Sequence, residues 1–363
     1  MKVFTATFFR NNYGSALQAY ALHQKIKELG GEPVIIDSSK ESKSIGLKQK
    51  ILLFLRPEKH YGLIRKIRRS FEKRVYKDKI RKINDFIMAN TKIVPFEECL
   101  KEMEQGGCVL LAGSDQVWNI LNHPINGFYL FDYVHSDTVC KISYAASIGI
   151  SELTKEQINY YKEVLAPFKV VSLREKIACD LLKNELTNTL VRQDVDPTLL
   201  HSAAFWEKLI PQRQVSVPFL FVYMLRPSNE VIEIARTIAK KNNLEIIYTG
   251  LYVNHYSGIK TIPDAGVEDF LYYIKNAEVI ITNSFHGTVF SLLFEKRFAS
   301  VRISSTSSRV ENLLEIVKLQ DHLIDNINDA AVAELYYDVE KVRRNLAFYR
   351  EESIQYLRSI INS

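Results

Sequence analysis

Short apolar runs rich in Val, Ile and Leu recur along the chain, and the stretches between them carry apolar residues at helical spacing. The runs cover residues 2–8, 33–37, 108–112, 139–145, 169–172 and 190–193 in the first half, and 219–225, 244–248, 279–281 and 297–302 in the second. Continuous apolar runs of this length predict strands buried on both faces of a parallel sheet. The helical spacing over residues 16–29, 229–241 and 267–276 predicts the crossover helices of βαβ units.

The two series of strands predict two doubly wound α/β domains, which a chain of 363 residues can hold. We expect an N-terminal Rossmann-like domain over residues 1–210 and a C-terminal Rossmann-like domain over residues 211–335, introduced by a proline-bounded linker at 211–218. Residues 336–363 are expected to form a C-terminal helix, as part of an amphipathic helical pattern over 329–361. Two such domains facing each other across a cleft resemble the GT-B architecture.

The positive charge is concentrated in one segment of the first domain. The chain has a net charge of +6, and residues 40–82 alone hold sixteen Lys and Arg against four Asp and Glu. We interpret residues 40–95 as a basic helical insertion in the first domain. One reading is a solvated helix face, and the other is a peripheral contact with anionic lipid or anionic carbohydrate. Nucleic acid is not an expected partner, because no nucleic-acid reading motif accompanies the charge.

The cysteines and the N-terminus bear on the compartment. Four cysteines are scattered without a CxxC pair or metal spacing, which suits a reducing cytosol. The N-terminus has no signal-peptide layout, and no run has the length of a transmembrane helix. We therefore expect a cytoplasmic protein, with the inner face of the membrane as the site of any peripheral contact. No set of Asp and His residues has metal-ligand spacing, so no catalytic metal is expected.

The candidate chemistry centres on residues 279–294. An apolar strand is followed by Thr-Asn-Ser, residue types that cap helices, and then by a helical pattern that starts at residue 285. His286 therefore lies in the first turn of a helix at the carboxyl end of a parallel strand, where α/β sheets bind ligands. The helix N-terminus suits a phosphate or carboxylate, and a histidine there can carry a proton. The alternative is a helix-start histidine bonded to a nearby carbonyl.

Five motifs occur in order over roughly residues 1–320. They are NYGSALQAY at 12–20, GSDQVWN at 113–119, SLRE at 172–175, DPTLL at 196–200 and TNSFHGT at 282–288. Together they resemble the polysaccharide pyruvyl transferase family. The resemblance implies a GT-B fold and transfer of a pyruvyl group from phosphoenolpyruvate to a pair of sugar hydroxyls, giving a pyruvate ketal. The implied partners are phosphoenolpyruvate and a sugar or lipid-linked oligosaccharide acceptor of capsule or exopolysaccharide biosynthesis, with no cofactor.

The same resemblance suggests roles for single residues. The family's catalytic histidine falls on His286, and the arginine of its Ser-x-Arg-Glu segment falls on Arg174. Some members have an arginine two residues before the histidine, where this chain has Ser284. Arg302 or Arg309 is a candidate to replace that arginine, and a different donor is the alternative.

Ketal formation needs an acid, a cationic cradle and a base. His286 is the expected acid, and Arg174 the expected cradle for phosphate or carboxylate, although an ordinary salt bridge is its alternative. Asp115 and Asp196 are the candidate bases. The alternative for Asp115 is a helix cap, and for Asp196, just before a proline, a structural turn role is favoured. The residues expected to bind the donor are Asn12, Gly14, Ser15, Ser147, Asn283, Ser284, Gly287, Thr288 and Arg309.

Two other functions remain open from the sequence. The first is a GT-B glycosyltransferase that uses a nucleotide-sugar donor. The second is a carbohydrate-binding protein of the same fold without catalytic activity. This alternative stays open because position 284 has a serine where some family members have an arginine.

Overall fold

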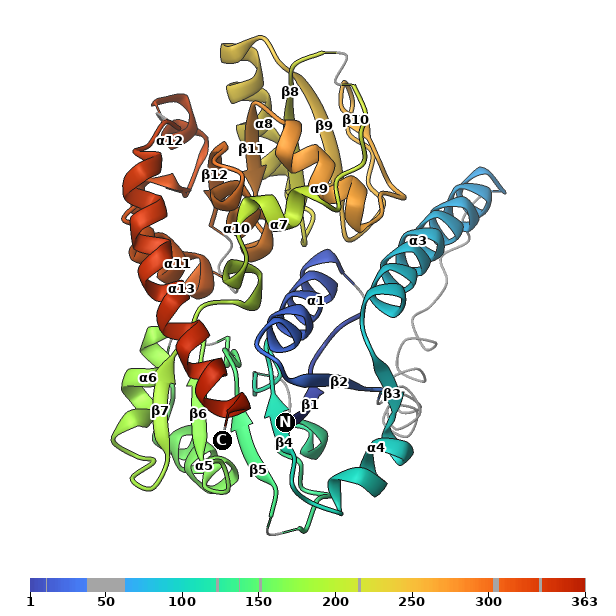
Figure 1. Ribbon diagram of the computed structural model, residues 1–363. Helices are drawn as coiled ribbons and strands as arrows, with labels where there is room; N and C mark the ends of the chain where they lie inside the picture. The colour runs from blue at the N-terminus through green and yellow to red at the C-terminus, as the bar shows by residue number, and fades with distance from the viewer. Residues whose placement is uncertain are drawn as a thin grey trace.

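Two parallel sheets, one from each half of the chain, form the centre of the protein (Figure 1). The computed structural model describes residues 1–10, 12–37, 63–121, 124–136, 138–149, 152–214, 217–302, 307–332 and 335–362. The first sheet has the order β3 (Ile93–Pro95), β2 (Glu32–Asp37), β1 (Lys2–Ala6), β4 (Val109–Ala112), β5 (Cys140–Ser143), β6 (Val170–Leu173), β7 (Leu190–Gln193). The second has the order β10 (Lys260–Thr261), β9 (Glu245–Gly250), β8 (Phe219–Met224), β11 (Val279–Thr282), β12 (Arg297–Val301), β13 (Leu323–Ile324).

Helices cover both faces of each sheet, as the apolar runs predict. Along β1, Val3 packs into one apolar cluster and Phe4 into another, because successive strand side chains point to opposite faces. The first domain contains α1 (Tyr13–Glu28), α3 (Leu63–Asn90), α4 (Phe96–Met103), η2 (Gly127–Leu130), α5 (Lys155–Leu165), α6 (Lys176–Lys183) and η3 (Pro197–Leu200). The remaining helices are α7 (Ala203–Glu207), α8 (Asn229–Asn242), α9 (Val267–Asn276), α10 (Phe285–Leu293), α11 (Ser307–Val317), η4 (Gln320–His322), α12 (Ile327–Val332) and α13 (Val339–Ile361).

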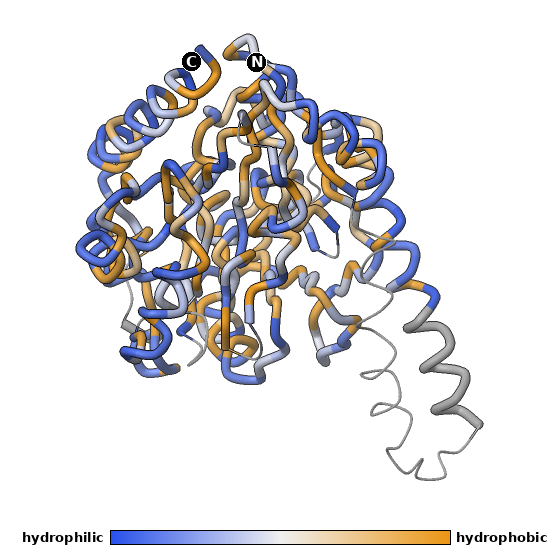
Figure 2. The backbone as a smooth tube through the Cα atoms, turned by 90° about the horizontal axis from the view of Figure 1, so that it is seen from below, coloured by the Kyte–Doolittle hydropathy of each residue, from blue (hydrophilic) through white to orange (hydrophobic). Residues whose placement is uncertain are grey.

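One apolar core continues from the first sheet into the second. Tyr13 of α1 stacks on Phe270 of α9 with ring centroids 4.7 Å apart, and Trp206 meets Phe290 of α10 at 5.0 Å. In Figure 2, hydrophobic stretches gather in the middle of the molecule, and the outer helices carry hydrophilic residues. The shared core fixes how the two domains face each other.

The C-terminal helix α13 crosses back onto the first domain (Figure 1). The Tyr356 hydroxyl donates to the carbonyl of Ser143 on β5 at 2.9 Å, and the Val195 N–H donates to the Ser353 hydroxyl at 3.1 Å. The amphipathic pattern over 329–361 predicted one helix, but the structure has two, α12 and α13. Asp338 caps α13 by accepting the N–H of Lys341 at 3.0 Å, which begins a new helix there.

The described part of the basic segment is the long helix α3, which reaches the second domain. Lys82 pairs with Asp264 at 2.9 Å, and buried Lys79 donates to the carbonyl of Gly250. Residues 40–62 of the predicted insertion lie outside the described residues. None of the helices in the described part of the chain combines the length and the apolar character needed to cross a bilayer.

Candidate active site

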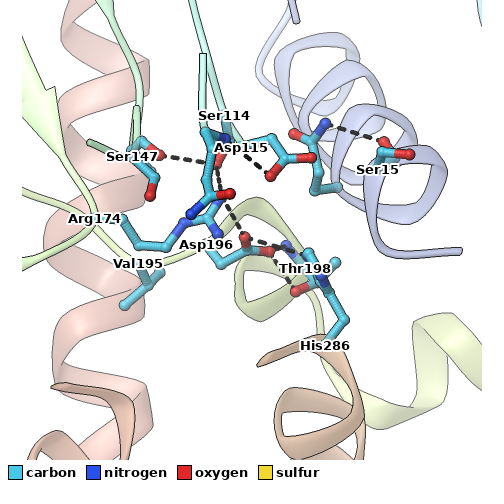
Figure 3. A network of polar contacts seen from close by, with 12 residues as sticks. Ser15, Ser114, Asp115, Ser147, Arg174, Val195, Asp196, Thr198 and His286 are labelled. Carbon is cyan, nitrogen blue, oxygen red and sulfur yellow. Dashed lines mark hydrogen bonds and ion pairs between the residues drawn. The ribbon is translucent and has the colours of Figure 1, made fainter. Parts of the chain in front are cut away.

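Polar residues that follow strands of both sheets meet between the domains (Figure 3). Ser114, Arg174 and Asp196 come after β4, β6 and β7 of the first sheet, and His286 comes after β11 of the second. Because all these strands are parallel to their neighbours, the residues lie at the carboxyl edges of the two sheets.

One oxygen of Asp196 joins the two domains. Its Oδ1 accepts the backbone N–H of Thr198 at 3.0 Å, as expected for a turn carboxylate. Its Oδ2 lies 2.9 Å from Nη2 of Arg174 and 3.5 Å from Nε2 of His286. Complete burial would raise the pKa of Asp196, but the Arg174 guanidinium, followed by His286, outweighs burial and holds this pKa well below its usual range.

His286 is held at the start of α10 and against the first domain. Ser284 caps α10 and accepts the N–H of Gly287 at 3.4 Å, which confirms the predicted strand, turn and helix. Gly14 in α1 faces the imidazole so closely that a β-carbon at position 14 would lie 2.7 Å from Cε1 and closer still to Nδ1. The two edges of the ring therefore face Asp196 and the start of α1.

Arg174 is 3% exposed and is bound on one side only. Its Nη2 donates to the Ser114 hydroxyl and pairs with Asp196, whereas Nε and Nη1 are buried without a hydrogen-bond partner in the described part of the chain. Its guanidinium also lies 4.9 Å from the ring centroid of Phe285. The arginine is thus anchored through Nη2, and its other two nitrogens have no partner among the described residues.

The two candidate replacements for an arginine at position 284 have different surroundings. Arg302 is exposed and pairs with Glu311 and Asp325 on the surface of the second domain. Arg309 of α11 is 8% exposed and lies 5.8 Å from the Phe285 ring centroid. Of these two arginines, Arg309 is the one that lies close to the Phe285 ring, as Arg174 does.

The expected donor-binding residues after β11 use their polar groups within the protein. Asn283 accepts the N–H of Leu225 at 2.9 Å and donates to the carbonyl of Arg226 at 2.9 Å. Thr288 shares a 2.7 Å hydrogen bond with Ser300, and a β-carbon on Gly287 would overlap Thr282. These contacts fix the start of α10, and direct donor contacts by Asn283, Ser284, Gly287 and Thr288 stay a prediction.

At the start of α1, Asn12 and Ser15 form the helix cap. Asn12 accepts the N–H of Ser15 at 2.9 Å, and the Ser15 hydroxyl donates to the carbonyls of Arg10 and Asn12. Their positions bring the α1 N-terminus, the positive end of its helix dipole, to the Gly14 edge of the His286 ring.

At the edge of the first sheet, Ser147 donates to Oε1 of Glu175, while Oε2 of Glu175 is buried without a hydrogen-bond partner among the described residues. Asp115 is half-buried, with φ of 73°, and accepts the N–H of Gln116 at 2.9 Å. Asp115 as the base stays a prediction.

Sequence reasoning favoured a structural turn role over a catalytic one for Asp196 and gave Glu175 no role in the site. Asp196 does bond a turn amide, but its second oxygen also meets Arg174 and His286. Its place in the polar cluster that follows a predicted strand, like that of Arg174, was the available signal. In the described part of the chain, His, Cys, Asp and Glu side chains form no group of three suited to a metal.

Comparison with solved structures defines the fold. The whole chain resembles S. aureus MnaA in its co-structure with UDP, with a TM-score of 0.54, 14% identity, and coverage of 100% of this chain and 98% of that chain. A putative UDP-N-acetylglucosamine 2-epimerase from Listeria monocytogenes gives a TM-score of 0.49, 12% identity, and coverage of 99% and 90%. The protein therefore has the expected GT-B fold of two Rossmann-like domains.

The family follows from the sequence itself. No curated protein matches the chain by sequence. The family model described as polysaccharide pyruvyl transferase matches residues 12–305, which include Arg174, Asp196 and His286 and most of both domains. The chain belongs to the polysaccharide pyruvyl transferase family, as its five motifs indicate.

Proposed function

We propose that this protein transfers the pyruvyl group of phosphoenolpyruvate to two hydroxyls of a sugar in a polysaccharide or its lipid-linked precursor. The observation that supports this most is the meeting of His286 and Arg174, from opposite domains, on one oxygen of Asp196. Because the chain belongs to the polysaccharide pyruvyl transferase family, we interpret these residues as groups that act in pyruvyl transfer. Phosphoenolpyruvate is the donor in this proposal, and no separate cofactor takes part.

The reaction requires one protonation and two deprotonations. The methylene carbon of phosphoenolpyruvate gains a proton and becomes a methyl group. The central carbon forms two bonds to sugar oxygens and loses its bond to the phosphate oxygen. Of the two hydroxyl protons released, one balances the new methyl hydrogen and the other leaves on hydrogen phosphate, so atoms and charge balance.

The positions of the residues suit these steps. Nε2 of His286 is directed at Asp196, so Nδ1, on the Gly14 side, is the nitrogen available to deliver the proton. The N-termini of α1 and α10 and the unbound nitrogens of Arg174 provide positive potential for the donor. Asp115 is the proposed base for the sugar hydroxyl.

The test is turnover of phosphoenolpyruvate with sugar acceptors in deuterated water. We expect phosphate release and a ketal whose methyl group carries one solvent deuterium. His286→Ala is expected to lower the rate by about 10²- to 10⁴-fold while the fold is kept, because an essential proton donor is lost. The exposed His255 provides a control, since His255→Ala should keep wild-type turnover.

Two results would contradict this function. One is wild-type turnover by His286→Ala. The other is glycosyl transfer from a nucleotide sugar, with no reaction of phosphoenolpyruvate, which would identify a GT-B glycosyltransferase instead.

We further propose that the protein works in the cytoplasm and that its basic segment, residues 40–82, contacts anionic lipid. Lys79 and Lys82 of this segment face the second domain, so the remaining basic residues would make the contact. Each contributes about 1 kcal/mol near an anionic surface, and the attraction falls with salt. Flotation with anionic liposomes, but not with neutral ones, is the expected result, and equal recovery with both excludes the contact.

A further inference from the structure

Arg174 and Arg309 share one phenylalanine but differ in charge compensation. Arg174 has a carboxylate partner in Asp196, 2.9 Å away. Arg309 is 8% exposed, and no carboxylate of the described residues lies within ion-pair distance of it. Burial, followed by repulsion from Arg174, lowers the pKa of Arg309, and attraction to the more distant Asp115, Glu175 and Asp196 offsets this only in part. A buried cation without a counterion is costly, which makes it a candidate anion-binding group.

A hydrogen bond from α11 to the first domain holds Arg309 on the side of Arg174. Asn312, one helical turn after Arg309 in α11, donates through Nδ2 to the backbone carbonyl of Arg174 at 3.3 Å. Its Oδ1 accepts the backbone N–H of Lys176 at 3.1 Å and the side-chain amide of Gln193 at 3.3 Å. Residues three apart lie on the same face of a helix, so this docking of α11 also places Arg309 toward the first domain.

An internal anion already occupies the space between Arg174 and His286. The carboxylate of Asp196 contacts both, so part of the positive charge of Arg174 is balanced before any donor binds. The donor in the proposed function carries a phosphate and a carboxylate, and it needs positive charge that the protein has not already neutralised. Arg309, whose guanidinium lies 5.8 Å from the ring centroid of Phe285, the residue before His286, adds a second buried positive charge that meets this need.

We propose that Arg309 binds one of the two anionic groups of the donor, with Phe285 and Arg174 beside it, and that Asn312 is the residue that positions it. This inference rests on the proposed function for the identity of the donor. In this proposal, Arg309 on α11 takes the role that an arginine at position 284 has in some members of the family.

The experiment measures binding by titration calorimetry to wild type and to Arg309→Met, which removes the charge and keeps an unbranched side chain. Phosphoenolpyruvate, inorganic phosphate and pyruvate are the three ligands, so the pattern of losses shows whether Arg309 binds phosphate or carboxylate. Phosphoenolpyruvate affinity is expected to fall about 10- to 100-fold, the range for a hydrogen bond to a charged group. Arg302→Met removes a surface arginine of the same domain and should leave affinity unchanged.

Stability and kinetics separate binding from a structural role. Without ligand, Arg309→Met is expected to melt at or above the wild-type temperature, because a buried uncompensated charge is removed. Asn312→Ala should raise KM for phosphoenolpyruvate about tenfold with a small change in kcat, because it displaces a binding group rather than the acid. Wild-type affinity in Arg309→Met, or a large loss of its stability without ligand, would overturn the inference.

The outcome is separable from that of the proposed function. If Arg309→Met forms ketal with the wild-type KM, the function stands and the inference fails. If wild type binds phosphate through Arg309 but forms no ketal from phosphoenolpyruvate with any acceptor, the anion site stands and the function fails.

Discussion

Gly14 and His286 belong to different domains, and the imidazole of His286 occupies the space that a side chain at position 14 would need. The start of α1 is fixed to the second domain at this level, because the Tyr13 hydroxyl donates to the carbonyl of Ala265 at 2.7 Å. The ring of the candidate acid is therefore held between the backbone of α1 and the carboxylate of Asp196.

We predict that Gly14→Ala lowers turnover by about 10²-fold or more, because the added methyl group displaces His286 from its position beside Asp196. Steady-state kinetics with phosphoenolpyruvate measures the loss, and circular dichroism shows that the fold is kept.

The same change in a His286→Ala background is the control. With the imidazole absent, replacing a helical glycine with alanine should raise the free energy of unfolding by about 0.5–1 kcal/mol. If Gly14→Ala lowers the free energy of unfolding in the wild-type background and raises it in the His286→Ala background, the methyl group contacts His286. An equal effect in both backgrounds would exclude that contact.

We predict that Asp196→Asn lowers the free energy of unfolding at pH 7 by about 3–5 kcal/mol, because Arg174 and His286 lose their shared carboxylate. The pKa of Asp196 is lowered in the folded protein, so its contribution is present above the unfolded value of 3.8 and is lost as pH falls below that value. Urea unfolding of both proteins at pH 7, 5 and 3 measures this. A difference in stability that does not shrink at pH 3 would show that the ion pairs are not its cause.

We predict that Arg174→Ala weakens phosphoenolpyruvate binding by about 1.5–3 kcal/mol, as for hydrogen bonds to charged groups. It should also destabilise the protein, because Asp196 loses its nearest cation. Arg174→Lys keeps a charge for Asp196 but not the planar fork, so it should recover stability more than donor affinity. Calorimetry and thermal melting measure the two effects, and equal phosphoenolpyruvate affinity in wild type and Arg174→Ala contradicts the role in binding.

We predict that the free energy of unfolding of wild type, relative to Lys79→Met, rises between pH 8 and 10.5. Burial lowers the pKa of Lys79 to about 8, so in this window the unfolded chain binds more protons than the folded one. The total gain is of order 3 kcal/mol, since each pKa unit corresponds to about 1.4 kcal/mol. Unfolding curves at pH 7.5, 9 and 10.5 test it, and parallel stabilities of the two proteins across this range would contradict it.

Local pattern was enough to predict most of the elements. The strand β8 lies within one residue of its predicted bounds and the helix α9 has the predicted bounds, because an apolar run or an amphipathic period marks burial directly. The break between α12 and α13 was missed, since the helical period continues through it and only the cap at Asp338 ends the pattern. The docking of α13 on β5 depends on contacts with residues about 200 positions earlier, such as that between Tyr356 and Ser143.

For the site, the sequence by itself determined which polar residues follow which buried strands, and so that His286 begins a helix and Arg174 lies at a sheet edge. Arg174 and His286 do meet at one anion, and that anion is the protein's own Asp196. That meeting, the Gly14 contact and the place of Arg309 depend on how two separately patterned domains are oriented. Periodicity reports the burial of each segment but not the orientation between domains, which the shared core and the docking of α11 and α13 decide.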